Sequence, residues 1–158
     1  MINEKSVGVI VFRYNPNEKE VQYLVLYSRG TYWNFPKGKM DAGENEIQTA
    51  KRELAEETNV KNVQIIKGWR QQTQFFFKEE RNGKKELIKK DFILYLAKMP
   101  KGAEVKVMEN HRHNGYAWLN VNVASKYLKF KKMKEIIKEA DSYVNKKIND
   151  YRKSQKKK

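Results

Sequence analysis

The sequence contains no cysteine, which excludes a disulfide framework and any chemistry that needs a thiol. It also lacks an apolar run of the roughly 20 residues that a membrane-spanning helix requires. The first residues show no signal-peptide pattern, because charge begins at Glu4 and a strand pattern follows. These absences predict a cytoplasmic protein that does not associate with membranes.

Acidic residues are scarce relative to basic ones, with 19 Asp and Glu against 34 Lys and Arg, and the formal net charge is +15. This charge suits a polyanionic substrate or nucleic acid, although a lysine-rich composition is equally a general habit of some genomes and of thermophiles. A chain of 158 residues predicts one compact domain. We place it at residues 1–150 and expect a basic, disordered tail at 151–158.

One stretch, Gly38 to Val60, is dense in carboxylates within a strongly basic chain and reads as a glycine-rich loop running into a helix. Asn45 is the expected N-cap, and Gln48 lies three residues later, at the spacing of a capping box. Asn59 is expected to end the helix, because asparagine tolerates the left-handed conformation of a C-terminal cap. The expected apolar stripe of this helix is Ile47, Ala50 and Leu54.

Three glutamates of this helix, Glu53, Glu56 and Glu57, are spaced i, i+3 and i+4 and therefore share one face. Their mutual repulsion needs compensation, and hard oxygen ligands select Mg²⁺ or Mn²⁺. The simpler interpretation is a solvated acidic helix face, which explains most charge runs. The residues around the glutamates decide between the two.

The stretch resembles the Nudix box. The signature is Gly, five residues, Glu, seven residues, Arg-Glu-apolar, any residue, Glu-Glu, any residue, Gly, apolar. The matching residues are Gly38, Glu44, Arg52-Glu53-Leu54, Glu56-Glu57 and Val60, and the one departure is Asn59, where the family has Gly. Asparagine reaches the same positive φ at modest cost.

This resemblance implies an α/β (α+β) fold, a Nudix-type α/β/α sandwich with a mixed sheet in a single domain. It also implies hydrolysis of a phosphoanhydride with Mg²⁺, or with Mn²⁺ in its place. The implied metal ligands are Glu53, Glu56, Glu57 and the carbonyl of Gly38, and one of these glutamates, with Glu53 the first candidate, also serves as the base. Arg52 and Glu44 would form an ion pair that orients the loop.

The flanks resemble the diadenosine tetraphosphate hydrolase branch of that family. Trp33 to Gly38 matches its W-x-F-P-K-G entry, which implies that Lys37 and Lys39 lean on substrate phosphates. Asn82-Gly83 predicts a hairpin. By position in that hairpin, Phe76 would stack on adenine and Lys90, with Lys89 as its rival, would meet phosphate; core packing is an equal interpretation of Phe76.

Residues 109–119 resemble the H-E-H-x-x-Y-x-W-L loop of the branch, and His111 and His113 are expected to bond substrate or loop backbone. Arg112 stands where relatives carry glutamate, which puts one outer metal site in doubt, and Glu109 is the nearest replacement. The second stacking partner would be Tyr127 or Phe130, for which core packing is the simpler interpretation.

The remaining pattern predicts strands at 6–14, 21–28, 63–69, 73–78, 91–97 and 104–107, a short helix at 123–128 capped by Asn122, and an amphipathic helix at 130–147. The leading functional prediction is a Mg²⁺-dependent pyrophosphohydrolase that cleaves dinucleoside polyphosphates, such as diadenosine tetraphosphate, to ATP and AMP. The alternatives are an RNA 5′-end pyrophosphohydrolase and a nucleotide- or RNA-binding module on the same fold. We expect a monomer or weak dimer.

Overall fold

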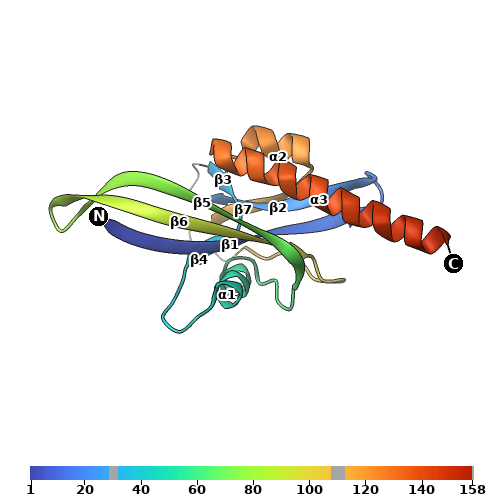
Figure 1. Ribbon diagram of the computed structural model, residues 1–158, viewed down its shortest axis with the longest axis horizontal. Coiled ribbons are helices and arrows are strands. Elements are labelled where there is room, and N and C mark those ends of the chain that lie inside the picture. The colour runs from blue at the N-terminus through green and yellow to red at the C-terminus, as the bar shows by residue number, and fades with distance from the viewer. Residues whose placement is uncertain (29–31, 108–112, 158) are drawn as a thin grey trace.

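The computed structural model describes residues 1–28, 32–107 and 113–157. Within them one mixed sheet is the centre of the fold (Figure 1). Its strands are β1 (Ile2–Asn15), β2 (Glu20–Ser28), β3 (Tyr32–Asn34), β4 (Lys37–Lys39), β5 (Gln64–Arg81), β6 (Lys84–Lys98) and β7 (His113–Leu119). The main order is β3-β2-β1-β6-β5, while β4 pairs with β1 and β7 with β2. β1 and β6 run parallel, and the other pairs are antiparallel.

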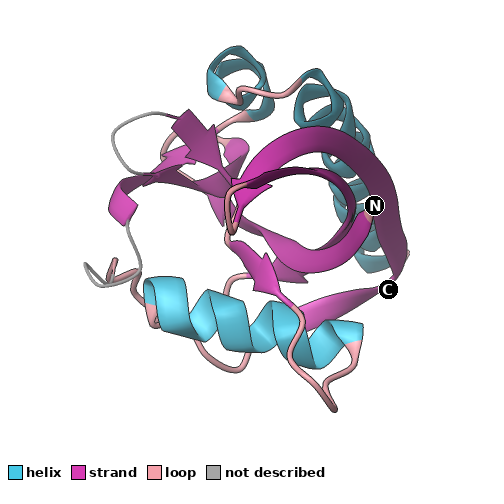
Figure 2. Ribbon diagram, turned by 90° about the vertical axis from the view of Figure 1, so that its left-hand side faces the viewer, coloured by secondary structure: helices cyan, strands magenta, loops and turns pink. Residues whose placement is uncertain are grey.

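Helices cover both faces of this sheet, as Figure 2 shows. The helix α1 (Glu46–Thr58) packs on one face, against a core that includes Val7, Val9 and Leu24. The helices α2 (Val121–Tyr127) and α3 (Lys131–Lys156) pack on the other, against a core that includes Ile10, Tyr23 and Phe92. The predicted α/β/α sandwich is therefore confirmed. None of the described helices has the length and apolar character needed to cross a bilayer.

The long β5–β6 hairpin turns at Asn82 and Gly83, whose φ angles of 52° and 77° are the positive values that a tight two-residue turn demands. This prediction is confirmed. The expectation of two separate strands at 63–69 and 73–78 is wrong, because β5 is one continuous strand. Its pairing with β6 shifts register between Ile65 and Arg70, where Gly68 has a φ of 84°.

Other boundaries also differ from the sequence prediction, since β1 and β6 are longer than expected and β3, β4 and β7 were not predicted. Residues 104–107 form no strand, and Lys106 instead donates its backbone N–H to the Thr58 carbonyl at 2.8 Å. Helix α2 is capped by Asn120, whose side chain accepts from the Val123 N–H, so Asn122 lies inside the helix. Helix α3 continues to Lys156, and residues 151–156 are therefore helical where a disordered tail was expected.

Candidate active site

The helix α1 begins and ends where the sequence predicts. The Asn45 side chain accepts the Gln48 N–H at 2.8 Å, and the Gln48 side chain accepts the Asn45 N–H at 2.9 Å, which completes the capping box. Asn59 adopts the left-handed conformation with a φ of 60°. Ala50 and Leu54 are fully buried, but Ile47 is 39% exposed, so the expected apolar stripe is wrong at its first position.

Glu46, the first residue of α1, ties the helix to three strands of the sheet. Its carboxylate accepts from the Arg70 side chain of β5 at 2.8 Å and 3.0 Å and from the Tyr95 hydroxyl of β6 at 2.7 Å. The Lys5 ammonium of β1 lies 2.7 Å away. These contacts, with the Arg70 hydrogen bonds the largest cause, lower the pKa of Glu46 to about 2. The network therefore fixes the start of the helix that carries the three glutamates.

Replacing Glu46 by glutamine is expected to lower the free energy of unfolding by about 1 kcal/mol at pH 7, since these pairs are partly exposed. The folded-state pKa lies below the ordinary value of 4.5, so the carboxylate stabilises the fold above that pH and less as pH falls toward 2. Urea unfolding between pH 7 and pH 3 should show the difference from the unchanged protein shrinking. Glu18→Gln, on an exposed turn, is the control, and an equal loss at both pH values would refute this assignment.

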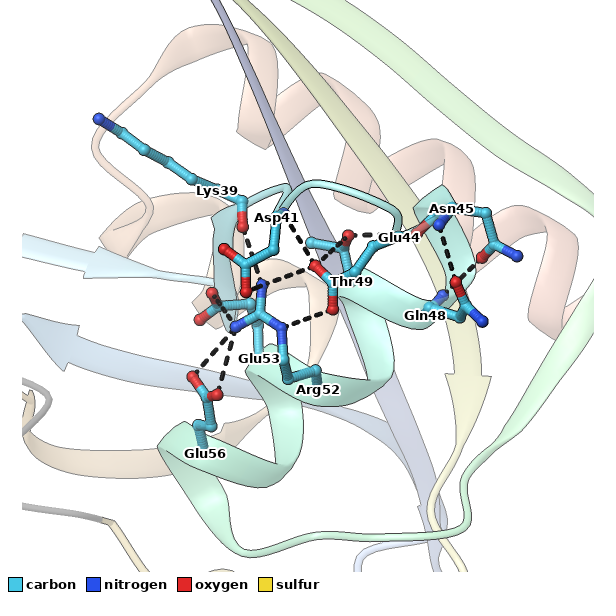
Figure 3. A network of polar contacts seen from close by, with 9 residues as sticks. All are labelled: Lys39, Asp41, Glu44, Asn45, Gln48, Thr49, Arg52, Glu53 and Glu56. Atoms are coloured by element: carbon cyan, nitrogen blue, oxygen red, sulfur yellow. Dashed lines mark hydrogen bonds and ion pairs between the residues drawn. The ribbon is translucent and has the colours of Figure 1, made fainter.

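Arg52 is the centre of the loop–helix junction (Figure 3). Its guanidinium donates two hydrogen bonds to the Glu44 carboxylate, of 2.7 Å and 3.0 Å. It also donates to the Lys39 carbonyl at 2.9 Å. The ion pair that the resemblance implies is therefore present, and Arg52 is the largest cause that lowers the pKa of Glu44 to about 2. The same guanidinium reaches Glu53 at 2.9 Å and Glu56 at 3.2 Å. It thus binds the loop to the helix and partly neutralises two of the three glutamates.

Glu53 lies against the backbone of Gly38. A Cβ atom built at Gly38 would overlap the Glu53 carboxylate, so only glycine permits this approach. Burial raises the pKa of Glu53, the Arg52 guanidinium opposes that rise, and the negative charges of Glu57 and Glu56 add to it. A carboxyl group with a raised pKa is suited to exchange a proton.

Glu57 is 6% exposed and is held by contacts from two other segments. Its carboxylate accepts the Lys37 backbone N–H at 3.3 Å and lies 3.3 Å from Nε2 of His113. The Nδ1 atom of the same ring is 3.0 Å from the Ser28 hydroxyl. His113, predicted to bond substrate or loop backbone, therefore contacts a candidate metal ligand; the Ser28 contact was not predicted.

The donor set suits a hard cation, because carboxylate and carbonyl oxygens are the ligands that Mg²⁺ and Mn²⁺ prefer. Across the described ranges, no group of three acidic or histidine side chains is arranged to hold an ion as it stands. Glu56 contacts Arg52 and Glu57 contacts His113 instead. The ligand atoms are therefore of the type that Mg²⁺ prefers. Their role as metal ligands stays a prediction.

A pocket of about 410 Å³ is linked to these carboxylates through Lys37. Lys37 connects the two, since its backbone contacts Glu57 while the residue lines the pocket. Lys90 lines it as well, and burial, followed by the positive charge of Lys37, lowers the pKa of Lys90. The aromatic lining includes Tyr32, Phe75, Phe76, Phe77, Phe92 and Phe130. Two lysine side chains and several aromatic rings in one pocket suit a ligand that carries phosphates and a nucleobase.

The hairpin register refines two of the predicted contacts. Phe75 pairs with Lys90 and Phe76 with Lys89, and directly opposed residues share a sheet face. Phe75 therefore stands on the face of Lys90, where its ring lies 5.5 Å from that of Phe130. Phe76 borders the same pocket but is 60% exposed. Phe75 was not predicted as a site residue.

Other candidates lie elsewhere. Tyr127 is 58% exposed and is not among the pocket residues, whereas Phe130, the alternative, lines the pocket. The Lys39 ammonium lies 3.2 Å from Glu4, outside the pocket lining. His111, together with Glu109 and Arg112, lies outside the described residues.

The chain is similar to known proteins in both sequence and structure. The family model for the NUDIX domain matches residues 4–140. The asymmetrical bis(5′-nucleosyl)-tetraphosphatase of Sus scrofa is 30% identical over 148 residues, covering 89% of this chain and 95% of the relative. An RNA pyrophosphohydrolase of Pelagibacter ubique is 38% identical over 62 residues, which cover 39% of this chain and 38% of the relative. The structure of a C. elegans Ap4A hydrolase binary complex superposes with a TM-score of 0.75 at 24% identity, covering 90% of this chain and 98% of that one.

Proposed function

The chain belongs to the Nudix hydrolase family, and from this premise we propose that it is a Mg²⁺-dependent pyrophosphohydrolase of dinucleoside polyphosphates. Diadenosine tetraphosphate is the proposed substrate, and ATP and AMP are the proposed products. The observation that carries the proposal is the pocket that joins Lys37 and Lys90 to aromatic rings, together with the contact of the Lys37 backbone with Glu57. Similarity along 89% of the chain to an asymmetrical tetraphosphatase supports the same substrate class.

The pocket would bind one nucleoside end of the substrate. Tyr32, Phe75 and Phe130 offer ring surface to a base, and stacking on aromatic rings contributes about 1–3 kcal/mol per base. Lys37 and Lys90 would meet the phosphates that follow the nucleoside and would stabilise the charge that develops on their oxygens. The phosphate chain would then lead from the pocket toward Glu57, because Lys37 contacts both.

Glu53, Glu56 and Glu57, with the Gly38 carbonyl, would hold the metal. A bound Mg²⁺ neutralises charge on phosphate oxygens and favours deprotonation of water. Glu53, whose pKa is raised by burial, would accept the proton of the attacking water. Arg52 and Glu44 would fix the loop, so that Gly38 and Glu53 keep their close approach.

Metal removal tests the proposal. Protein treated with EDTA is expected to release no nucleotide from diadenosine tetraphosphate, and added Mg²⁺ or Mn²⁺ should restore equal amounts of ATP and AMP, measured by chromatography. Unfolding by heat, followed in parallel, shows that the treated protein is still folded. Full turnover after chelation, or ADP as the sole product, would overturn the proposal.

Removal of pyrophosphate from the 5′ end of RNA is the second candidate function. It is favoured by the partial similarity to an RNA pyrophosphohydrolase and by the net charge of +15. The acidic residues of the site would serve both reactions, so the substrate decides between them. Family membership and the retained glutamates favour an enzyme over a pure binding module. A monomer or weak dimer in the cytoplasm remains part of the proposal.

A further inference from the structure

A second cavity, of about 970 Å³, lies away from the proposed hydrolytic chemistry. It is formed by β7, the ends of β1 and β6 and the segment 99–105. We call it the β7 groove and define it by the basic and aromatic residues that line it, Arg13, Tyr14, Lys98, Lys101, Tyr116 and Trp118. No residue of the groove lines the pocket that carries Lys37 and Lys90.

Aromatic rings give the groove stacking surfaces. Tyr14 and Tyr116 are each 44% exposed, so part of each large aromatic side chain is open to solvent. The Arg13 guanidinium lies 4.3 Å from the centre of the Trp118 ring, which is cation–π geometry. Exposed rings beside a stacked guanidinium are the surfaces on which the bases of single-stranded nucleic acid stack.

The charge of the groove is mainly positive. Lys98 and Lys101 are exposed, and Arg13 donates to the neutral side chain of Gln22 at 2.9 Å. Among the lining residues in the described ranges, Glu104 is the single acidic one. This balance of charge favours a polyanion over a neutral or basic ligand.

The groove is connected to the active site and to a second basic surface. Strand β7 carries His113, which contacts Glu57, and Tyr116 and Trp118 follow about 10 and 17 Å further along at roughly 3.3 Å per residue. At the other end, Tyr14 and Lys98 also line the cavity beneath α3, where the Arg152 guanidinium lies 5.8 Å from the Tyr14 ring. Positive side chains therefore line two cavities that share Tyr14 and Lys98.

We propose that the β7 groove binds single-stranded nucleic acid, with bases stacked on Tyr116 and on the Arg13 guanidinium that covers Trp118, and phosphates paired with Lys98 and Lys101. This binding is separate from hydrolysis and does not require that the proposed substrate be correct.

The test uses a fluorescein-labelled decanucleotide with a 5′-hydroxyl, which offers no phosphoanhydride, as RNA and as DNA of the same sequence. Fluorescence anisotropy of the full chain should show binding that weakens with salt. Tyr116→Ala is expected to weaken binding about 5- to 150-fold, whereas Tyr116→Trp keeps it. Lys101→Ala should reduce the slope of log K against log salt by about 0.7, and the control Lys84→Ala, on the exposed hairpin tip, should not.

Equal affinity for RNA and DNA, or a preference for either, supports the proposal, since both present bases and phosphates. No binding at low salt, or binding that neither Tyr116→Ala nor Lys101→Ala changes, would overturn it. Equal affinity for a poly-glutamate peptide would assign the groove to acidic peptides and would also overturn it. Hydrolysis of diadenosine tetraphosphate by the unchanged protein is measured separately, so failure of one proposal is distinguishable from failure of the other.

Discussion

Replacement of Glu57 by glutamine is expected to lower kcat by at least about 10³-fold, which corresponds to about 4 kcal/mol of transition-state stabilisation. Glutamine has nearly the same shape and can still accept the Lys37 N–H that holds Glu57. The fold should therefore persist while the negative charge that a metal needs is lost. Turnover of diadenosine tetraphosphate with saturating Mg²⁺, together with the thermal midpoint of unfolding, measures the two effects.

Glu135→Gln is the matched control, because it makes the same chemical change on an exposed position of α3. Its turnover should equal that of the unchanged protein. A Glu57→Gln protein with near-normal kcat would remove Glu57 from the metal site. A large loss of stability in that variant would instead assign Glu57 a structural role through His113 and Lys37.

Replacement of Gly38 by alanine is expected to lower kcat by about 10²-fold or more. The added methyl group would occupy the space of the Glu53 carboxylate, and displacement of a catalytic group by about 1 Å costs on that order. Steady-state kinetics should place the loss in kcat, since the pocket residues that bind the nucleoside are unchanged.

Gly115→Ala provides the comparison for that experiment, because a Cβ at Gly115 meets no atom within 4 Å. Both variants make the same change in backbone freedom, so only the contact with Glu53 differs. Normal turnover by Gly38→Ala would show that the close approach of the glycine to Glu53 has no catalytic importance.

The loop and helix of the candidate site were predictable because their signals are local. A capping box, a C-terminal asparagine and the spacing of three glutamates lie within one stretch, and the structure follows them. Lys37, predicted to lean on substrate phosphates, lines the pocket. The strand expected at 21–28 is likewise present as β2, and nearly all of it is buried.

Phe75 was not among the predicted site residues, although the sequence held the signal that pairs it with Lys90. Asn82-Gly83 fixes a two-residue turn, and counting outward from it pairs Lys90 with Phe75. The run of three phenylalanines at 75–77 hides which ring shares the sheet face of Lys90. Register, and not resemblance by position, resolves such a run.

The Glu46 network could not be predicted, because its partners come from strands far apart in the sequence. Lys5 and Arg70 meet at Glu46 only after β1 and β5 have joined the same sheet. The expectation of disorder at 151–158 differs from the structure for another reason. Lysine and glutamine are good helix formers, and positive charge near a helix C-terminus is favourable, so α3 continues to Lys156.

The most direct test of the proposed function is a comparison of kcat/KM for diadenosine tetraphosphate and for a short 5′-triphosphorylated RNA, with Mg²⁺ in both. The pocket of Lys37, Lys90 and Phe75 predicts rapid release of ATP and AMP from the dinucleotide and a lower kcat/KM for RNA. Preferential release of pyrophosphate from the RNA, with slow attack on the dinucleotide, would contradict that prediction.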